Sequence, residues 1–219
     1  MIGKAIEPEI KTICKDVHGW FFAVCLVKNC SHASTNFIYD ALAKWSIELG
    51  THKIGTRVFQ ICFETGNKEQ TLKMARAVVS VLPELIEDQF GNYLVSKAGK
   101  VHNKRLNRQV FDFIAADFIR LSNHKFSSIT LETFFSLEES AMELERIITG
   151  KHTNEDTTSM REIESQAAVL IKRISLIISE LGNNPYGNYV LWKILQLPFK
   201  QALKNCFLEE IVKAKKSLT

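Results

Sequence analysis

Five segments of the sequence share a set of side chains that could hold an unpaired nucleobase. In each set a planar or bulky residue is flanked, one position before and three after, by residues that in most cases can hydrogen-bond. The sets are Trp20/Phe21/Val24, Thr56/Arg57/Gln60, Asn92/Tyr93/Ser96, Ser128/Ile129/Glu132 and Asn188/Tyr189/Trp192. A ring or guanidinium plane that stacks on a base contributes about 1–3 kcal/mol. Such a series suits the recognition of single-stranded RNA; alternatively, the aromatic rings pack between neighbouring repeats.

The spacing within a set predicts that its members share one face of a helix. The first, second and fifth residues of a helical stretch fall at about 0°, 100° and 40° around the axis. A small residue directly precedes each set, and the five are Gly19, Gly55, Gly91, Ser127 and Gly187. Their separations of 36, 36, 36 and 60 residues indicate an internal repeat.

Each repeat is expected to begin its helix in the same way. The side chain three residues before the small residue can accept hydrogen bonds from the free N–H groups of the helix start. Asp16, Asp88 and Asn184 are suited to this role. The equivalent positions elsewhere hold His52 and His124, so we expect these histidines to be structural.

The opposite side of each predicted helix is apolar and should be buried. Its members are Val58, Phe59, Cys62, Leu94, Val95, Ala98, Val190, Leu191 and Ile194. Longer amphipathic stretches, Leu72–Leu85 and Leu106–Leu121, lie between the segments. A repeat of about three helices cannot bury its apolar face alone, and stacking of neighbours completes the core. The predicted fold is therefore all-α, a crescent-shaped α-solenoid forming one domain of about five repeats over residues 1–219.

Two regions depart from the regular repeat. The last interval is 24 residues longer than the others and contains the polar run GKHTNEDTTS, which predicts a flexible loop at about 149–160. At the N-terminal end only Ala5–Ile13 precede the first segment. Either the chain is a fragment of a longer array, or a protein partner or a second copy covers that end. Trp20 and Phe21 are the expected contacts of such a partner, unless these rings fill the terminal core. The stretch Gln201–Thr219 can cap the other end.

The composition excludes several other classes of protein. Only 10 glycines and 4 prolines occur, which disfavours a loop-rich β-sandwich or a glycine-rich phosphate-binding domain. A net charge of +4 permits a nucleic-acid partner without indicating one. The longest apolar run, Trp20–Val27, is too short to span a membrane. Without an apolar leader we expect a cytoplasmic protein, with the nucleus or nucleolus as the alternative.

The sequence indicates neither a metal site nor an enzyme. The five cysteines contain no CxxC pair and are expected to be reduced core thiols; they are Cys14, Cys25, Cys30, Cys62 and Cys206. A zinc site from Cys14, His18, Cys25 and Cys30 lacks any standard ligand spacing. The sequence shows neither a nucleophile–base motif nor a phosphate-binding motif, so we expect no catalysis and no cofactor.

The repeated segments resemble the Pumilio (PUF) family of RNA-binding proteins. HKIGTRVFQ, DQFGNYLVS, HKFSSITLE and NPYGNYVLW are similar to the fifth to eighth repeats of the usual eight, including the long insertion before the last. DVHGWFFAV would be a divergent fourth repeat. The resemblance implies that each repeat binds one base and that the array runs antiparallel to the RNA. It further implies a target in mRNA 3′ untranslated regions and post-transcriptional regulation through mRNA stability or translation repression.

The family's base code implies a base for each of four repeats. Asn188 and Tyr189 imply U, Ser128 with Glu132 implies G, Asn92 and Tyr93 imply U, and Thr56, Arg57 and Gln60 imply A. The carboxylate of Glu132 would accept from guanine N1–H and N2–H, Gln60 would meet the adenine edge and Arg57 would stack. Taken from the last repeat backwards, these bases spell 5′-UGUA-3′.

Several positions depart from the family pattern. Ser96 and Trp192 replace a glutamine, and serine is shorter while an indole offers one donor and no acceptor. Ile129 replaces a planar stacker, and Phe21 belongs to a set without a base-edge partner, so weaker contacts are expected there. Lys53, Lys97, Lys125 and Lys193 either meet phosphates or are ordinary surface lysines. We expect selective G and A positions, weaker U positions and a Kd on the order of micromolar.

These departures keep a second hypothesis open. In it the chain is a degenerate PUF-like scaffold that acts through protein contacts, for example in ribosome assembly. Comparing RNA with and without UGUA separates the two hypotheses.

Overall fold

The computed structural model describes residues 5–137, 140–149, 160–199 and 201–216. Within these residues the chain is helical, with a 3-10 turn η1 (Glu7–Glu9) and no strand, which confirms the all-α prediction. The chain divides into two compact units, Met1–Val110 (unit 1) and Phe111–Thr219 (unit 2). No described helix is both long enough and apolar enough to cross a lipid bilayer.

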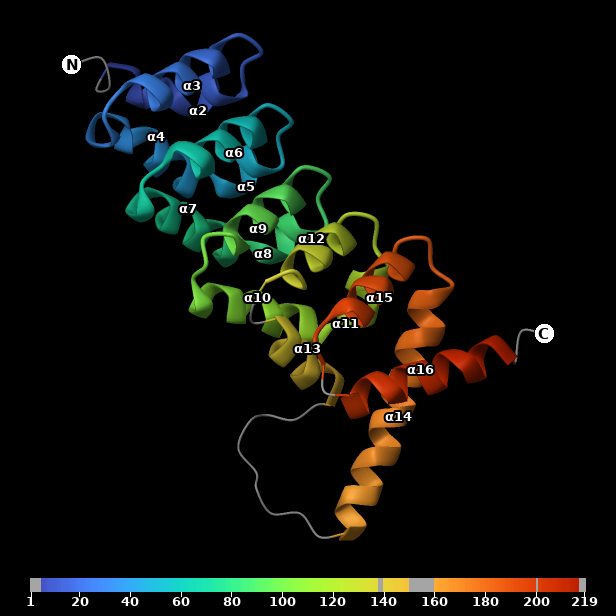
Figure 1. Ribbon diagram of the computed structural model, residues 1–219. Helices are drawn as coiled ribbons and strands as arrows, with labels where there is room; N and C mark the ends of the chain where they lie inside the picture. Colours follow the sequence, from blue (N-terminus) through green and yellow to red (C-terminus); the bar gives the residue numbers. More distant parts are fainter. Residues whose placement is uncertain (1–4, 138–139, 150–159, 200, 217–219) are drawn as a thin grey trace. The chain divides into compact units, whose positions relative to one another are not determined.

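Unit 1 consists of consecutive groups of three helices, each a short, a middle and a long one. They are α2 (Ile10–Lys15), α3 (Gly19–Asn29), α4 (His32–Lys44), α5 (Ser46–Gly50), α6 (Gly55–Thr65), α7 (Lys68–Ser80), α8 (Leu82–Ile86), α9 (Gly91–Gly99) and the first part of α10 (Lys104–Ala116). The middle helix α6 contacts both α3 and α9, as Figure 1 shows in blue to green. The predicted three-helix repeat is confirmed.

Unit 2 continues the same order with one enlarged helix. After the end of α10 it contains α11 (Phe118–Asn123), α12 (Ser127–Phe134), α13 (Ser140–Thr149), α14 (Met160–Gly182), α15 (Gly187–Gln196) and α16 (Gln201–Lys216). The middle helices α12 and α15 contact each other, and α14 packs against both α15 and α16 (Figure 1). The 23-residue α14 takes the place of a short first helix, so it contains much of the insertion. The loop predicted within 150–159 lies outside the described residues.

The predicted core is buried. All nine apolar positions on the inner side of α6, α9 and α15 are at most 8% exposed: Val58, Phe59, Cys62, Leu94, Val95, Ala98, Val190, Leu191 and Ile194. The amphipathic stretches between them are each broken into two helices. The breaks fall at Val81 and Asp117, whose backbones leave the helical region, and Pro83 lies in the first turn of α8, where its missing N–H costs nothing.

The cysteine prediction is correct for two residues and wrong for two. Cys14 and Cys62 are buried, Cys206 is half-buried, and Cys25 and Cys30 are exposed. Cys25 shares the exposed side of α3 with Phe21, and Cys30 ends that helix. Burial raises the pKa of the Cys14 thiol to about 12, which makes it unreactive. The described residues contain no cluster of three or more metal-ligating side chains.

Candidate nucleic-acid interface

The five middle helices α3, α6, α9, α12 and α15, called the site helices below, begin with one shared device. Asp88 Oδ1 accepts hydrogen bonds from the N–H groups of Phe90 and Gly91 at 2.9 and 2.8 Å. Asn184 Oδ1 accepts from Tyr186 and Gly187 at 2.8 and 3.0 Å. In α3 the equivalent bonds to His18 and Gly19 hold the pKa of the Asp16 carboxyl below its ordinary value.

Histidine performs the same role in the other two repeats. His52 Nδ1 accepts from Ile54 and Gly55, both at 3.3 Å. His124 Nδ1 lies 3.4 and 3.5 Å from the N–H groups of Phe126 and Ser127. The prediction of a structural role at the helix start is confirmed for all five residues, and the imidazole bonds are the longer ones.

The small residue at each start allows the site helix to lie against the preceding short helix. A Cβ on Gly55 would come within 2.4 Å of the Leu49 carbonyl oxygen. A Cβ on Gly91 would come within 2.7 Å of the equivalent oxygen of Leu85. In α12 the position is Ser127, whose hydroxyl donates to the Leu121 carbonyl at 2.6 Å.

The second residues of the five sets are exposed on their helices. Phe21 is 62% exposed, Tyr93 46%, Ile129 37% and Tyr189 60%, and Arg57 is also exposed. Because α6 lies between α3 and α9, unit 1 carries three such groups on successive helices. In unit 2, neighbouring α12 and α15 carry two. These side chains are open to a ligand instead of being sealed in the core.

The first residues of three sets are buried, which differs from the surface position predicted for them. Thr56, Asn92 and Ser128 are 3%, 0% and 3% exposed. Thr56 Oγ1 donates to the Gly50 carbonyl at 2.6 Å, Asn92 Nδ2 to the Asp88 carbonyl at 2.8 Å and Ser128 Oγ to the Lys125 carbonyl at 3.3 Å. Because each site helix begins so close to the short helix before it, these three side chains lie beneath the preceding turn. Asn188 is the exposed one, and a role for any of the four in contacting a base stays a prediction.

The fifth residues differ most from one repeat to the next. Gln60 and Glu132 are half-buried. Ser96 is 9% exposed, and its Oγ has no hydrogen-bond partner among the described residues. Trp192 is 59% exposed, and Val24 is buried. Burial raises the pKa of the Glu132 carboxyl, and the nearby charge of Lys193 partly opposes this rise.

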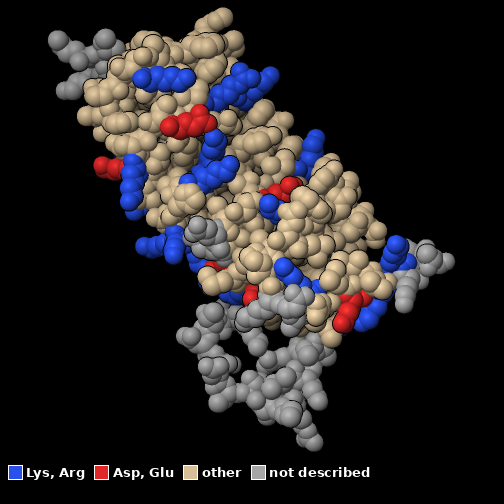
Figure 2. All heavy atoms as spheres, in the orientation of Figure 1, with Lys and Arg blue, Asp and Glu red and all other residues tan. Residues whose placement is uncertain are grey.

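The cations near the site helices each have a different neighbour. Lys97 Nζ lies 2.7 Å from Glu64 Oε1, so part of its charge is neutralised. The Arg57 guanidinium lies 5.9 Å from the Trp20 ring, and Lys125 Nζ lies 5.2 Å from the Phe126 ring. On the face of unit 1 drawn in Figure 2, Lys and Arg side chains form separate groups, with acidic side chains beside some of them. A phosphate backbone that crosses this face would therefore meet separate cations.

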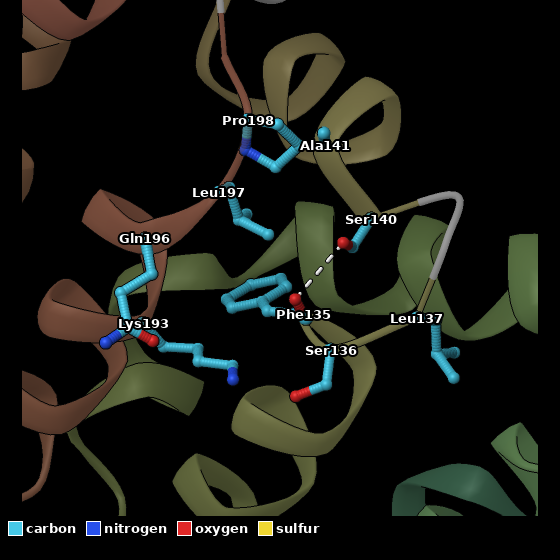
Figure 3. Close-up of a pocket in the computed structure, with 9 residues that line it drawn as sticks. All are labelled: Phe135, Ser136, Leu137, Ser140, Ala141, Lys193, Gln196, Leu197 and Pro198. Atoms are coloured by element: carbon cyan, nitrogen blue, oxygen red, sulfur yellow. Dashed lines mark hydrogen bonds between the residues drawn. The ribbon is translucent and has the colours of Figure 1, made fainter.

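Unit 2 also contains a cavity of about 320 Å³ beside the ends of α12 and α15. Its lining residues are Phe135, Ser136, Leu137, Ser140, Ala141, Lys193, Gln196, Leu197 and Pro198. Lys193 extends beneath the Phe135 ring toward Ser136 (Figure 3). Ser140 Oγ donates to the Phe135 carbonyl at 3.1 Å. The sequence pattern did not predict this cavity, because its walls come from the ends of separate helices.

Comparisons with known proteins agree with this architecture. A family profile described as "NOP9-like PUF repeat domain" matches residues 100–219, and one described as "Pumilio-family RNA binding repeat" matches residues 47–78. The chain belongs to the Pumilio (PUF) family of RNA-binding repeats.

Individual relatives are distant and longer. A Pumilio domain-containing protein of Schizosaccharomyces pombe is 24% identical over 211 residues, covering 88% of this chain and 30% of that protein. Pumilio homology domain family member 4 of Saccharomyces cerevisiae is 25% identical over 203 residues, covering 90% of this chain and 20% of that protein. The chain thus spans less than a third of the length of these relatives.

Solved structures show the same fold. The Puf4 RNA-binding domain bound to an HO endonuclease RNA 3′ UTR recognition sequence superposes with a TM-score of 0.73 at 22% identity, covering 97% of this chain and 61% of that one. The RNA-binding domain of yeast Puf5p bound to SMX2 RNA gives 0.67 at 26% identity, covering 94% and 57%. The α-solenoid class predicted from the repeats is confirmed.

Proposed function

We propose that the chain binds single-stranded RNA selectively, one base per site helix, with a UGUA-like core. The observation that carries the proposal is the repeated exposure of a planar or bulky side chain directly after the same helix start. In unit 1, Tyr93 and Arg57 are the stacking groups, and in unit 2 Tyr189 is. Stacking on side chains of this kind contributes about 1–3 kcal/mol per base.

Selectivity in the proposal comes from the fifth residues. Glu132 presents two carboxylate acceptors to the N1–H and N2–H donors of guanine. Gln60 offers both a donor and an acceptor, which suits the adenine edge. Ser96 is short and buried, and Trp192 has one donor only, so these two repeats are assigned the weakly selective U positions. Unit 2 thus recognises UG and unit 1 recognises UA.

The relatives support RNA as the ligand. Puf4 and Puf5p are each bound to RNA in their solved structures. By analogy with the Puf4 complex, we propose that the targets lie in mRNA 3′ untranslated regions and that the protein regulates mRNA stability or translation. A cytoplasmic location fits this role, and the nucleus or nucleolus is the alternative. Partners at the N-terminal end would contact Phe21, which is exposed.

Fluorescence anisotropy tests the proposal. An oligonucleotide that contains UGUA should bind at least about tenfold more tightly than one with ACAA in its place, a difference of about 1.4 kcal/mol. Equal affinity for both sequences would remove selective RNA binding.

A second candidate is a scaffold that acts through protein contacts, for example in ribosome assembly. It is favoured by three of the five fifth residues. Val24 has no hydrogen-bonding group, the Ser96 hydroxyl is short and buried, and Trp192 has one donor and no acceptor. The NOP9-like profile over residues 100–219 also points away from the typical eight-repeat regulators. RNA affinity that is absent or independent of sequence would favour this candidate.

A further inference from the structure

The helix α15 carries two large aromatic side chains that its own packing does not need. Tyr189 is 60% exposed and Trp192 is 59% exposed. They are three residues apart and therefore lie one turn from each other on the same side of the helix. The opposite side already buries Val190, Leu191 and Ile194 completely or nearly so. Two aromatic surfaces facing solvent beside each other indicate a ligand that covers them.

The indole has the wrong chemistry for reading the edge of a single base. Trp192 offers one N–H donor and no acceptor, whereas the uracil edge presents a donor between two acceptors. Each of the four bases has at least one acceptor that an indole N–H can meet, so a bond to Trp192 cannot distinguish them. The indole face, however, stacks on any base because every base has a π-face.

The position of Trp192 identifies the ligand as RNA. It occupies the same place on α15 as Glu132 on α12, and the two helices contact each other. Tyr189 likewise occupies the place of Tyr93 and Arg57, the stackers of unit 1. The charge of Lys193, the next residue of α15, acts on Glu132, which agrees with the contact between the two helices.

We infer that α15 is a base-neutral clamp, which holds the nucleotide preceding the guanine by stacking on Tyr189 and Trp192. It accepts all four bases because the exposed Asn188 amide, which carries both donors and an acceptor, can hydrogen-bond to the edge of any of them. This inference rests on the proposed function. It differs from it at the first base of the RNA, where it expects no preference for U instead of a weak one. Purines offer the larger stacking area, so a slight purine preference is expected. The first nucleotide then contributes affinity, and the selectivity of the chain begins at the second.

The test uses the full chain and RNAs of the form NGUA, with U, C, A, G or an abasic site at the first position. Anisotropy should give dissociation constants within about threefold for the four bases, and binding weaker by about tenfold or more for the abasic RNA. A tenfold preference of the unsubstituted protein for U, or abasic RNA bound as tightly as the others, would overturn the inference.

Two substitutions sharpen the result. Trp192→Ala should weaken binding of all four RNAs by a similar factor, about fivefold, because stacking on Tyr189 remains, while Trp192→Gln should create a preference for U of about fivefold or more. Because Trp192 is exposed, both variants should keep the wild-type Tm. As a matched control, Leu208→Ala removes a similarly exposed apolar side chain of α16, 56% exposed, and should leave RNA binding unchanged. Unaltered RNA affinity in Trp192→Ala would assign the indole to a protein partner and overturn the clamp.

Failure of the clamp and failure of the proposed function remain distinguishable. If the second-position guanine is still preferred over adenine and Glu132→Gln abolishes that preference, RNA recognition stands whatever happens at the first position. If no RNA binds, both fail.

Discussion

The neighbouring helices α12 and α15 begin alike and differ in what they present. At each start one polar side chain, that of His124 for α12 and of Asn184 for α15, accepts hydrogen bonds from two backbone N–H groups. At the fifth position, however, α12 holds the half-buried carboxylate of Glu132 and α15 the exposed indole of Trp192. The hydrogen-bonded helix start is therefore the same in both helices, while the side chain at the fifth position differs. The two features can be tested separately.

The largest expected effect comes from breaking the shared framework. Gly55→Ala places a Cβ 2.4 Å from the Leu49 carbonyl oxygen, and overpacking against rigid backbone should lower the free energy of unfolding by about 3 kcal/mol. Gly182→Ala is the matched control, since its Cβ would meet only Leu191 Cδ2 at 3.9 Å. Chemical denaturation measures both. Equal stability of the two variants would show that close approach at Gly55 is not required.

The next effect concerns the carboxylate that distinguishes α12. Glu132→Gln replaces one of two acceptors by a donor that faces a guanine donor, so the preference for UGUA over UAUA should fall by about 1–3 kcal/mol. Anisotropy with the two RNAs measures it. Glu209→Gln changes an exposed carboxylate of α16 and should alter neither affinity. A retained guanine preference in Glu132→Gln would mean that the base assignment for α12 is wrong.

A smaller effect compares the two kinds of helix start. Asp88→Ala removes two hydrogen bonds of 2.9 and 2.8 Å and should cost about 1 kcal/mol of unfolding free energy. His124→Ala removes longer contacts of 3.4 and 3.5 Å and should cost less. Thermal or urea unfolding ranks them, and the reverse order would contradict the interpretation of the histidines as weaker caps.

The smallest effect is a dependence of guanine binding on pH. Burial raises the pKa of Glu132, and only the ionised carboxylate accepts both guanine protons. Affinity for UGUA RNA should therefore be highest at neutral pH and should decline as the pH falls toward that raised pKa. The decline should begin at higher pH in Lys193→Met, because the opposing cation is removed. Anisotropy from about pH 7.5 to about pH 5 measures the change, and an identical decline in Glu132→Gln would assign it to another group.

Much of the fold follows from features that are local in sequence. The 36-residue interval, the apolar side of each site helix and the acceptor before each start all concern residues within one repeat, so they were predictable. The burial of Thr56, Asn92 and Ser128 was not, because it depends on how closely the preceding short helix approaches.

Pairings between repeats were equally hidden from the sequence. The bond between Lys97 and Glu64 joins α9 to α6, and no periodic pattern indicates which lysine has a partner. The cavity beside Lys193 likewise depends on where α12 and α15 end. The length of α14 was not predicted, because within the insertion only the polar run at about 149–160 was interpreted, as a loop.

The acceptor that begins each site helix lies only three residues from the small residue it serves. The turn that begins each site helix is therefore formed by residues of a single repeat. As a consequence, whole 36-residue repeats can be duplicated or removed during evolution, because each repeat carries the residues that form its own turn. The number of bases contacted can then change one at a time. A chimera in which one 36-residue repeat is duplicated should recognise an RNA that is one nucleotide longer.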